Sequence, residues 1–414
     1  MPSARKGGAD KSAASSYAVV VGTCDTKAED LAFVKSLLIA AGVAARLVDV
    51  GTRSKAKADV TAAAVAACHP KGAKAVTGTA DRGEAVAAMS AAFEAWVERH
   101  KGEISGMIGV GGSGNTALVT PGMRRLPIGL PKIMVSTVAS GNVAPYVGPN
   151  DIAMMYSVVD VAGLNAISRR VLGNAANMLA GAVKNTIPVP EEQDKPAIGL
   201  TMFGVTTPCV NRVVDTLKNR YECFVFHATG TGGQTLEKLA DSGRLTGIID
   251  STTTEIADLL MGGVMSAGED RLGAVIRTKI PYVGSCGALD MVNFGGIETV
   301  PEKYKARKLH EHNAQVTLMR TTPDENKAMG EWIAAKLNRC DGPVRFLIPE
   351  KGVSIIDVDG APFRDAAADK ALFDAIEKGV KQTANRKVTR LPYAINDPEF
   401  ADALVANFNE IAGG

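Results

Sequence analysis

The sequence predicts an α/β protein of two units, each built on a mainly parallel β-sheet. Apolar, β-rich runs alternate along the chain with segments whose apolar residues recur at helical spacing. Polar, glycine-rich segments follow many of the apolar runs. The alternation restarts after residues 187–196, which are rich in proline and charge and form the best candidate for a linker. Alternating strands and helices are typical of parallel sheets with right-handed crossovers.

The first unit is expected over residues 17–186, after a lead-in over residues 1–16 that is polar and lacks an apolar signal core. Its first helix is indicated by Leu31, Val34 and Leu38, which recur at helical spacing before Gly42. The expected strands are 17–21, 44–50, 107–110 and 132–136, and the expected helices are 27–41, 62–68, 84–97 and 163–183.

The second unit is expected over residues 197–414. Pro208 suits the first turn of a helix that runs to Leu217, because a first-turn N–H has no partner within the helix. In parallel sheets ligands bind outside the carboxyl ends of the strands, so the polar loops of each unit point to one edge of its sheet. The expected strands are 197–203, 223–227, 247–250, 282–285 and 345–349, and the further expected helices are 326–337, 370–384 and 398–411.

The composition gives no bulk electrostatic reason to expect nucleic acid or a membrane as partner, because 46 basic residues face 44 acidic ones. No apolar segment approaches the roughly 20 residues that span a bilayer. The six cysteines are scattered and form no CxxC pair, which indicates free thiols in a reducing compartment. We therefore expect a cytoplasmic protein.

Two glycine-containing loops in the first unit predict a nucleotide-binding site. Residues 111–115 follow an apolar strand and precede a helix-compatible stretch, and residues 22–27 follow the first strand in the same way. Glycines let a ligand approach the main chain, and the N–H groups at a helix start suit phosphate. The alternative is a tight turn whose glycines serve packing alone. The P-loop sequence GxxxxGK[ST] is absent.

Several loops together resemble the ATP-binding region family of the tomato mosaic virus resistance protein, which has bacterial and fungal relatives. The resemblance covers residues 17–411, nearly the whole chain, and its motifs keep the same order. The matching segments are 22–27, 110–114, 133–141, 201–211, 226–230, 287–295, 308–313 and 347–354. Antiviral activity is not implied, because function belongs to sites rather than to folds.

The resemblance implies two Rossmann-like domains with an interdomain cleft, ATP held by the first domain, and a homodimer. Many relatives carry or adjoin a TIM barrel. The expected partner is therefore a small-molecule substrate or a protein, for which a separate TIM-barrel protein is one candidate. Together with Gly22 and Lys27 of the first loop, the expected ATP contacts are Thr23, Asp25, Thr26, Thr52, Thr79, Ala80, Asp81, Arg82, Gly111, Gly112, Ser113, Gly114 and Asn115.

Three of these residues have a second interpretation. Asp25 is either the N-cap of the following helix or a ligand of Mg²⁺ or of a nucleotide hydroxyl. Lys27 is either the cation that meets the phosphates or a surface lysine. Arg82 either binds phosphate through its forked guanidinium or is a solvent-exposed residue at the start of a helix.

The second unit contains the more reactive side chains, and its polar loops predict a second small-molecule pocket. Cys209 is expected at a helix start, where thiol pKa values fall, and with His227 it forms a nucleophile–base candidate. The alternative is a small buried cysteine. Glu350, beside Lys351, is an acid–base candidate or a surface ion pair. The other polar loop residues are Glu255, Asp290, Asn293, His310 and His312.

His310 and His312 share a face only if they lie on a strand. Their surroundings, residues 304–318, read as helical or irregular, so substrate contact or a structural role is favoured over a metal half-site. His310 is therefore retained as a catalytic candidate together with His227, Cys209 and Glu350.

These observations lead to one main hypothesis and two alternatives for function. The main hypothesis is an ATP-dependent enzyme (a transferase, ligase or hydrolase) that acts on a small metabolite between the domains, with Mg²⁺ neutralising the phosphates. The first alternative is a non-catalytic, nucleotide-dependent regulatory protein that docks a protein partner. The second is a dehydrogenase, although the GxGxxG pattern is absent from the first turn and only Asp49, ending the second strand, fits it.

Overall fold

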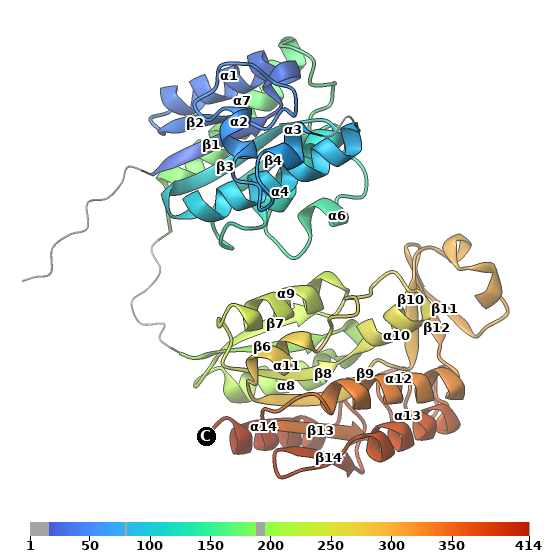
Figure 1. Cartoon of the computed structure of the whole chain (residues 1–414). Coiled ribbons are helices and arrows are strands. Elements are labelled where there is room, and N and C mark those ends of the chain that lie inside the picture. Colours follow the sequence, from blue (N-terminus) through green and yellow to red (C-terminus); the bar gives the residue numbers. More distant parts are fainter. Residues whose placement is uncertain (1–15, 79–80, 188–194, 414) are drawn as a thin grey trace, which may run out of the picture. The chain divides into compact units, whose positions relative to one another are not determined.

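The computed structural model describes residues 16–78, 81–187 and 195–413. The chain forms two compact units, Met1–Val189 and Pro190–Gly414, and each is described by itself (Figure 1). Most of the expected lead-in and most of the expected linker lie outside the described residues.

Five parallel strands form the sheet of the N-terminal unit, in the order β2-β1-β3-β4-β5. The strands are β1 (Tyr17–Gly22), β2 (Ala45–Asp49), β3 (Ile104–Gly111), β4 (Lys132–Ser136) and β5 (Ala153–Tyr156). The helices are α1 (Cys24–Ala40), α2 (Ala62–Ala66), α3 (Lys74–Thr77), α4 (Arg82–His100), α5 (Ser113–Met123), α6 (Ala144–Val147) and α7 (Ala166–Lys184).

Helices cover both faces of this sheet (Figure 1), so its central strands are apolar on both sides. On β1, Ala18 and Val20 belong to the core formed with α1 and α7. Val19 and Val21 point the other way, into the core formed with α4 and α5. This double burial explains why the strands read as unbroken apolar runs.

The order of strands reverses beside β1, because β2 lies on one side of it and β3 on the other. The helices that leave β1 and β3, α1 and α5, pack in different cores on opposite faces of the sheet. Their first turns therefore diverge at the carboxyl edge. Ligand sites of open α/β sheets form at such a reversal.

The C-terminal unit has a six-stranded parallel sheet in the order β14-β13-β9-β8-β6-β7. Its strands are β6 (Ala197–Met202), β7 (Glu222–His227), β8 (Gly247–Thr252), β9 (Tyr282–Gly287), β13 (Val344–Pro349) and β14 (Arg386–Leu391). Its helices are α8 (Thr207–Leu217), α9 (Thr231–Asp241), α10 (Thr254–Met261), α11 (Gly273–Thr278), α12 (Pro323–Leu337), α13 (Ala366–Gly379) and α14 (Pro398–Ile411).

The C-terminal unit also carries a small antiparallel sheet in the order β10-β12-β11. These strands are β10 (Met291–Phe294), β11 (Leu309–Asn313) and β12 (Val316–Arg320). The prediction of helical or irregular structure around His310 is wrong, because β11 pairs with β12 through a register that includes His310 opposite Leu318. The segment is polar and short, so pairing rather than a local pattern decides its conformation.

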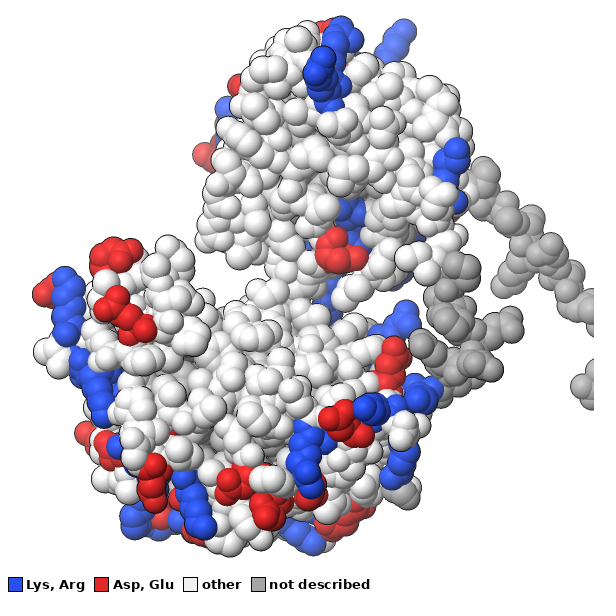
Figure 2. Space-filling model, turned by 180° about the vertical axis from the view of Figure 1, so that it is seen from behind, with Lys and Arg blue, Asp and Glu red and all other residues white. Residues whose placement is uncertain are grey.

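The predicted fold class, α/β with two Rossmann-like units and mainly parallel sheets, is confirmed. Basic and acidic side chains lie interspersed on the face of the C-terminal unit in Figure 2. The ion pairs of this unit include those of Arg390 with Asp374 and with Glu377. Among the described residues, no helix combines the length and the apolar character that crossing a bilayer requires.

Candidate functional site

A cavity of about 630 Å³ lies at the strand reversal of the N-terminal unit. Its size falls within the roughly 300–1,000 Å³ common for small-molecule sites. The predicted nucleotide contacts that line it are Thr23, Asp25, Thr26, Lys27, Thr52, Arg82, Gly112, Ser113, Gly114 and Asn115. The structure adds Val50, Arg53, Val86, Leu118 and Asp160, for which the sequence carries no motif.

The starts of α1 and α5 both open onto this cavity. Their N-cap residues, Thr23 and Gly112, place no side-chain acceptor on the first-turn N–H groups. The Thr23 hydroxyl instead lies 3.1 Å from that of Thr26. The N-cap interpretation of Asp25 is wrong, since Asp25 is the second residue of α1 and its side chain is exposed. The uncapped start of α5 makes the cavity favourable for an anion, whereas the first N–H of α1, that of Cys24, is already bound by the Asp49 carboxylate.

The glycines of the two loops divide into two groups. A Cβ on Gly22 would lie 3.0 Å from the Leu31 side chain, and one on Gly111 would lie 2.7 Å from Asn115, so both serve packing. A Cβ on Gly114 would meet nothing within 4 Å, and one on Gly112 would meet only a hydroxyl at 3.6 Å. Gly112 has φ −88°, which any residue can adopt. Packing therefore does not explain Gly112 and Gly114. At these two positions the cavity floor is main chain without side chains.

Asp49 connects the loops that follow β1 and β2 through hydrogen bonds, although it does not line the cavity itself. Its buried Oδ1 accepts hydrogen bonds from the N–H groups of Cys24 at 3.0 Å and Gly51 at 2.9 Å. Burial and the nearby Asp49 carboxylate raise the pKa of the Cys24 thiol to about 12, so this thiol stays protonated. In the sequence Asp49 is only a weak dehydrogenase signal, because its role in holding the two loops depends on tertiary contacts.

Charged side chains of both signs surround the cavity. Lys27 is half-buried rather than freely solvated, and its ammonium donates a hydrogen bond to the carbonyl of Val161. Arg53 and Arg82 are exposed on the wall, as is Asp160.

The loop before α4 contributes less than expected. Asp81 caps α4 by accepting a hydrogen bond at 2.8 Å from the N–H of Glu84, and it does not line the cavity. Thr79 and Ala80 lie outside the described residues.

Cys209 is not placed to act as a nucleophile. It lies in the first turn of α8, as expected, but its side chain points into the hydrophobic core that α8 helps to form. Burial raises the pKa of its thiol to about 12, which outweighs any lowering by the helix start. The alternative of a small buried cysteine is the correct one.

The other catalytic candidates are also dispersed. His227 ends β7 and Glu350 follows β13, and these strands are separated by β9, β8 and β6 in the sheet. Four spacings of about 4.8 Å place the two strand ends about 19 Å apart. Glu350 is exposed and pairs loosely with Arg390, at 3.8 Å. His310 lies on β11 in the small sheet, with its ring nearly perpendicular to that of Phe363 and the two ring centres 6.2 Å apart.

No metal centre is built by the histidines. His312 is exposed on β11, and among the described residues no group of three or more His, Cys, Asp or Glu side chains is arranged to hold a metal ion.

The glycine-rich loop of the C-terminal unit, residues 228–233, holds an anion of its own. The buried Glu255 carboxylate accepts hydrogen bonds from the N–H groups of Gly230 at 2.7 Å and Gly233 at 3.0 Å, at the start of α9. A Cβ on Gly233 would lie 2.2 Å from this carboxylate. Arg271 binds the other carboxylate oxygen at 2.8 Å. Gly233 therefore makes room for Glu255, and the N–H groups of this loop are occupied by a carboxylate of the protein itself.

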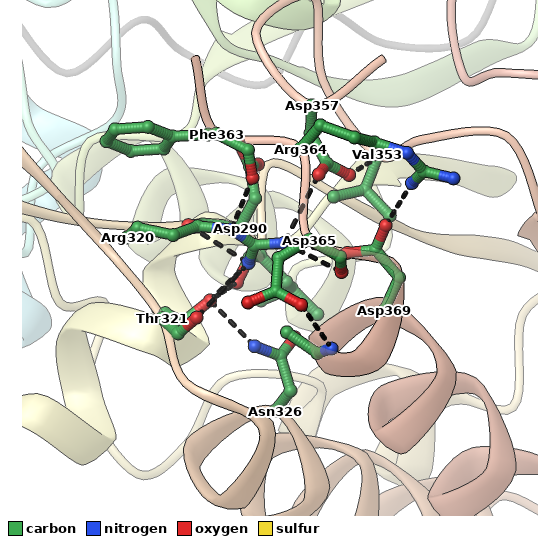
Figure 3. A network of polar contacts seen from close by, with 12 residues as sticks. Asp290, Arg320, Thr321, Asn326, Val353, Asp357, Phe363, Arg364, Asp365 and Asp369 are labelled. Atoms are coloured by element: carbon green, nitrogen blue, oxygen red, sulfur yellow. Dashed lines mark hydrogen bonds and ion pairs between the residues drawn. The ribbon is translucent and has the colours of Figure 1, made fainter. Parts of the chain in front are cut away.

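Asp290 belongs to a buried network around Arg320 (Figure 3). The Arg320 guanidinium donates to Asp369 at 2.8 Å and to Asp357 at 3.2 Å. Ser354 donates to Asp290 at 2.8 Å. Burial raises the pKa values of Asp290 and Asp357 to about 6 and that of Asp369 to about 7. The network joins the loop after β13 to the small sheet and to α13, which is a structural role.

Asn293, the remaining polar residue noted in the sequence, is also buried in a structural contact. Its main-chain N–H donates to the Asp258 carboxylate at 2.8 Å.

The two units correspond to two domains of one family. Residues 16–188 match the N-terminal domain of the family described as "Uncharacterised protein family (UPF0261)", and residues 195–412 match its C-terminal domain. The chain belongs to the UPF0261 family.

Relatives from bacteria and a plant share most of this UPF0261 chain. A UPF0261 protein of Mesorhizobium japonicum is 59% identical over 95% of this chain and 98% of its own length. One of Clostridium tetani is 45% identical over 93% and 96%. The ToMV resistance protein Tm-1(GCR237) of Solanum lycopersicum is 44% identical over 95% of this chain but only 55% of its own length. Its ToMV susceptible counterpart, tm-1(GCR26), is 43% identical over the same shares, so similarity to this region does not distinguish resistance from susceptibility.

Proposed function

We propose that the N-terminal domain of this UPF0261 protein binds ATP together with Mg²⁺ in the cavity at its strand reversal. The observation that carries the proposal is the bare floor at Gly112 and Gly114, beside an uncapped start of α5. A triphosphate placed there would meet main-chain N–H groups at short range, with no Cβ between them.

The remaining lining residues fit the parts of a nucleotide. Lys27 and Arg82 supply positive charge for the phosphates, and Arg supplies it in a fork that matches phosphate oxygens. Asp25 is an exposed carboxylate at the same wall, and Mg²⁺ in nucleotide sites takes one or two carboxylates besides phosphate oxygens.

Titration calorimetry with ATP and MgCl₂ on the full chain tests the proposal. Wild-type protein is expected to bind, and Gly114→Val is expected to weaken binding at least tenfold because its side chain occupies the cavity floor. Gly181→Val is the matched control, since Gly181 is also helical and also meets nothing within 4 Å, but lies on α7 outside the cavity. Absence of heat and of thermal protection with wild-type protein would reject ATP binding.

What ATP does once bound separates two functions. The first is an ATP-dependent enzyme that acts on a small metabolite, in which Asp25 holds the Mg²⁺ that neutralises the phosphates during group transfer. In that case, ATP turnover with the right metabolite requires Asp25, and Asp25→Asn removes turnover more strongly than it weakens ATP binding.

The second candidate is a non-catalytic regulatory protein that uses ATP to control docking of a protein partner. The observation that favours it is the dispersal of the catalytic candidates, with Cys209 buried and His227 distant from Glu350 in the sheet. A panel of metabolites that yields no ADP or pyrophosphate from bound ATP would select this function.

We also propose that the protein is a cytoplasmic homodimer. All six cysteines are free, which fits a reducing compartment. The proposal of a dimer is based on the family resemblance alone. Light scattering on the purified chain tests it.

A further inference from the structure

We infer that the side-chain carbonyl of Asn115 binds a ribose hydroxyl of the nucleotide and so selects ribonucleotides over analogues that lack these hydroxyls. This inference rests on the proposed ATP site and adds to it a residue that recognises the ribose.

Asn115 lines the cavity, but only 7% of its surface is exposed. Its Nδ2 donates a hydrogen bond to the Val110 carbonyl at 2.6 Å, which fixes the orientation of the amide. The other end of the amide, Oδ1, is buried and accepts no hydrogen bond from any residue that the structure describes. A buried acceptor without a donor is costly, so a ligand that supplies the donor gains affinity.

The position of Asn115 along α5 indicates which part of the ligand supplies this donor. Gly112 and Gly114, at the helix start, form the bare floor for phosphates. Leu118 lies three residues beyond Asn115, on the same helical face, and faces the cavity together with Val86 of α4. The lining thus runs from polar main chain, through Asn115, to an apolar wall. A nucleotide runs in the same order, from phosphate through ribose to base.

The chemistry of Oδ1 excludes phosphate as its partner. An amide carbonyl accepts hydrogen bonds and repels phosphate oxygens, which also accept. A ribose hydroxyl donates, and its loss would leave Oδ1 unpaired again. The main-chain N–H of Asn115 stays available for phosphate in any side-chain variant, so the two roles of this residue can be separated.

An unpaired amide oxygen alone does not identify a ligand site. Asn326 in α12 has the same feature, with Nδ2 bonded to Thr321 and Oδ1 unpaired, yet it is buried in the C-terminal unit and is not part of this cavity. Asn115 differs because it lies on the cavity wall. Asn326 therefore provides a matched control.

The test measures the affinity of the full chain for ATP, 2′,3′-dideoxy-ATP and inorganic tripolyphosphate, each with Mg²⁺. Wild-type protein is expected to bind dideoxy-ATP about tenfold or more weakly than ATP, the effect of one unpaired buried acceptor. Asn115→Leu, of similar volume but without the amide acceptor and donor, is expected to bind ATP and dideoxy-ATP equally. Asn326→Leu is expected to retain the wild-type preference.

Two results would overturn the inference. Equal affinity of wild-type protein for ATP and dideoxy-ATP is the first, and it requires no variant. Full preference for ATP in Asn115→Leu, shown by thermal unfolding to be folded, is the second. Failure of both ATP and tripolyphosphate to bind would instead reject the proposed function itself.

Discussion

The carboxylate of Asp49 accepts a hydrogen bond at 3.0 Å from the main-chain N–H of Cys24, the first residue of α1. The same oxygen accepts from Gly51, so one buried side chain at the end of β2 fixes the loops after β1 and β2. Both loops line the candidate nucleotide cavity. The shape of the cavity therefore depends on a residue that does not line it.

Removal of this clamp is expected to weaken both the fold and the site. Asp49→Ala leaves two buried N–H groups without an acceptor, and we expect a loss of about 2–4 kcal/mol in the free energy of unfolding, measured with urea. ATP affinity is expected to fall as well, because the loop positions relax. Asp160→Ala removes an exposed carboxylate of the same cavity and is expected to leave stability unchanged. Equal stability of Asp49→Ala and wild type would contradict the clamp.

Lys27 offers a test of the electrostatics of the site. Lys27→Met is expected to weaken ATP binding about fivefold to tenfold and to make the affinity less sensitive to salt, because one ammonium near the phosphates is lost. Lys35→Met on the same helix is the control, since Lys35 pairs with Asp59 and does not line the cavity. The two variants are compared by calorimetry at two ionic strengths. An identical salt dependence for Lys27→Met and wild type would argue against phosphate contact.

Glu255 is expected to be a stability residue of the C-terminal domain. Glu255→Ala would leave Arg271 and the N–H groups of Gly230 and Gly233 without this partner inside the core. Loss of one member of a buried ion pair costs about 3–5 kcal/mol, which urea unfolding of the C-terminal domain would register. ATP affinity in the N-terminal domain should not change, and a parallel loss of ATP affinity would place a nucleotide in this loop instead.

The buried carboxylates around Arg320 make stability depend on pH. Burial raises the folded-state pKa values of Asp290 and Asp357 to about 6 and of Asp369 to about 7, above the unfolded value of about 4. The folded domain therefore binds more protons than the unfolded chain. The contribution of these groups to the free energy of unfolding is greatest below about pH 4. It decreases as the pH rises from about 4 to about 7.

The expected measurement is a decrease in unfolding free energy of about 2 kcal/mol per pH unit between pH 5 and 7, the linkage effect of one to two protons. Arg320 and Arg364 face these carboxylates and already hold their pKa values below those that burial alone would give. Asp290→Asn should flatten this slope because it removes one of the titrating groups. A slope that is the same with and without Asp290 would show that other groups dominate.

Much of the fold could be predicted because local patterns and tertiary contacts agree. The strands β1 and β3 are buried on both faces, so their apolar runs are visible in the sequence. Cys209 shows the opposite case. A helix start predicts a reactive thiol, but the surrounding core raises its pKa, and burial is a property of neighbours distant along the chain.

The sequence by itself determined the fold class and the loops that line the N-terminal cavity, because strand burial, helical periodicity and glycine placement are local properties. Tertiary structure alone decided which glycine-rich loop is open and which is filled. Gly114 faces empty space, whereas Gly233 faces the carboxylate of Glu255, which lies 22 residues further along the chain. Folding brings that side chain into the loop, and no pattern within the loop itself records it.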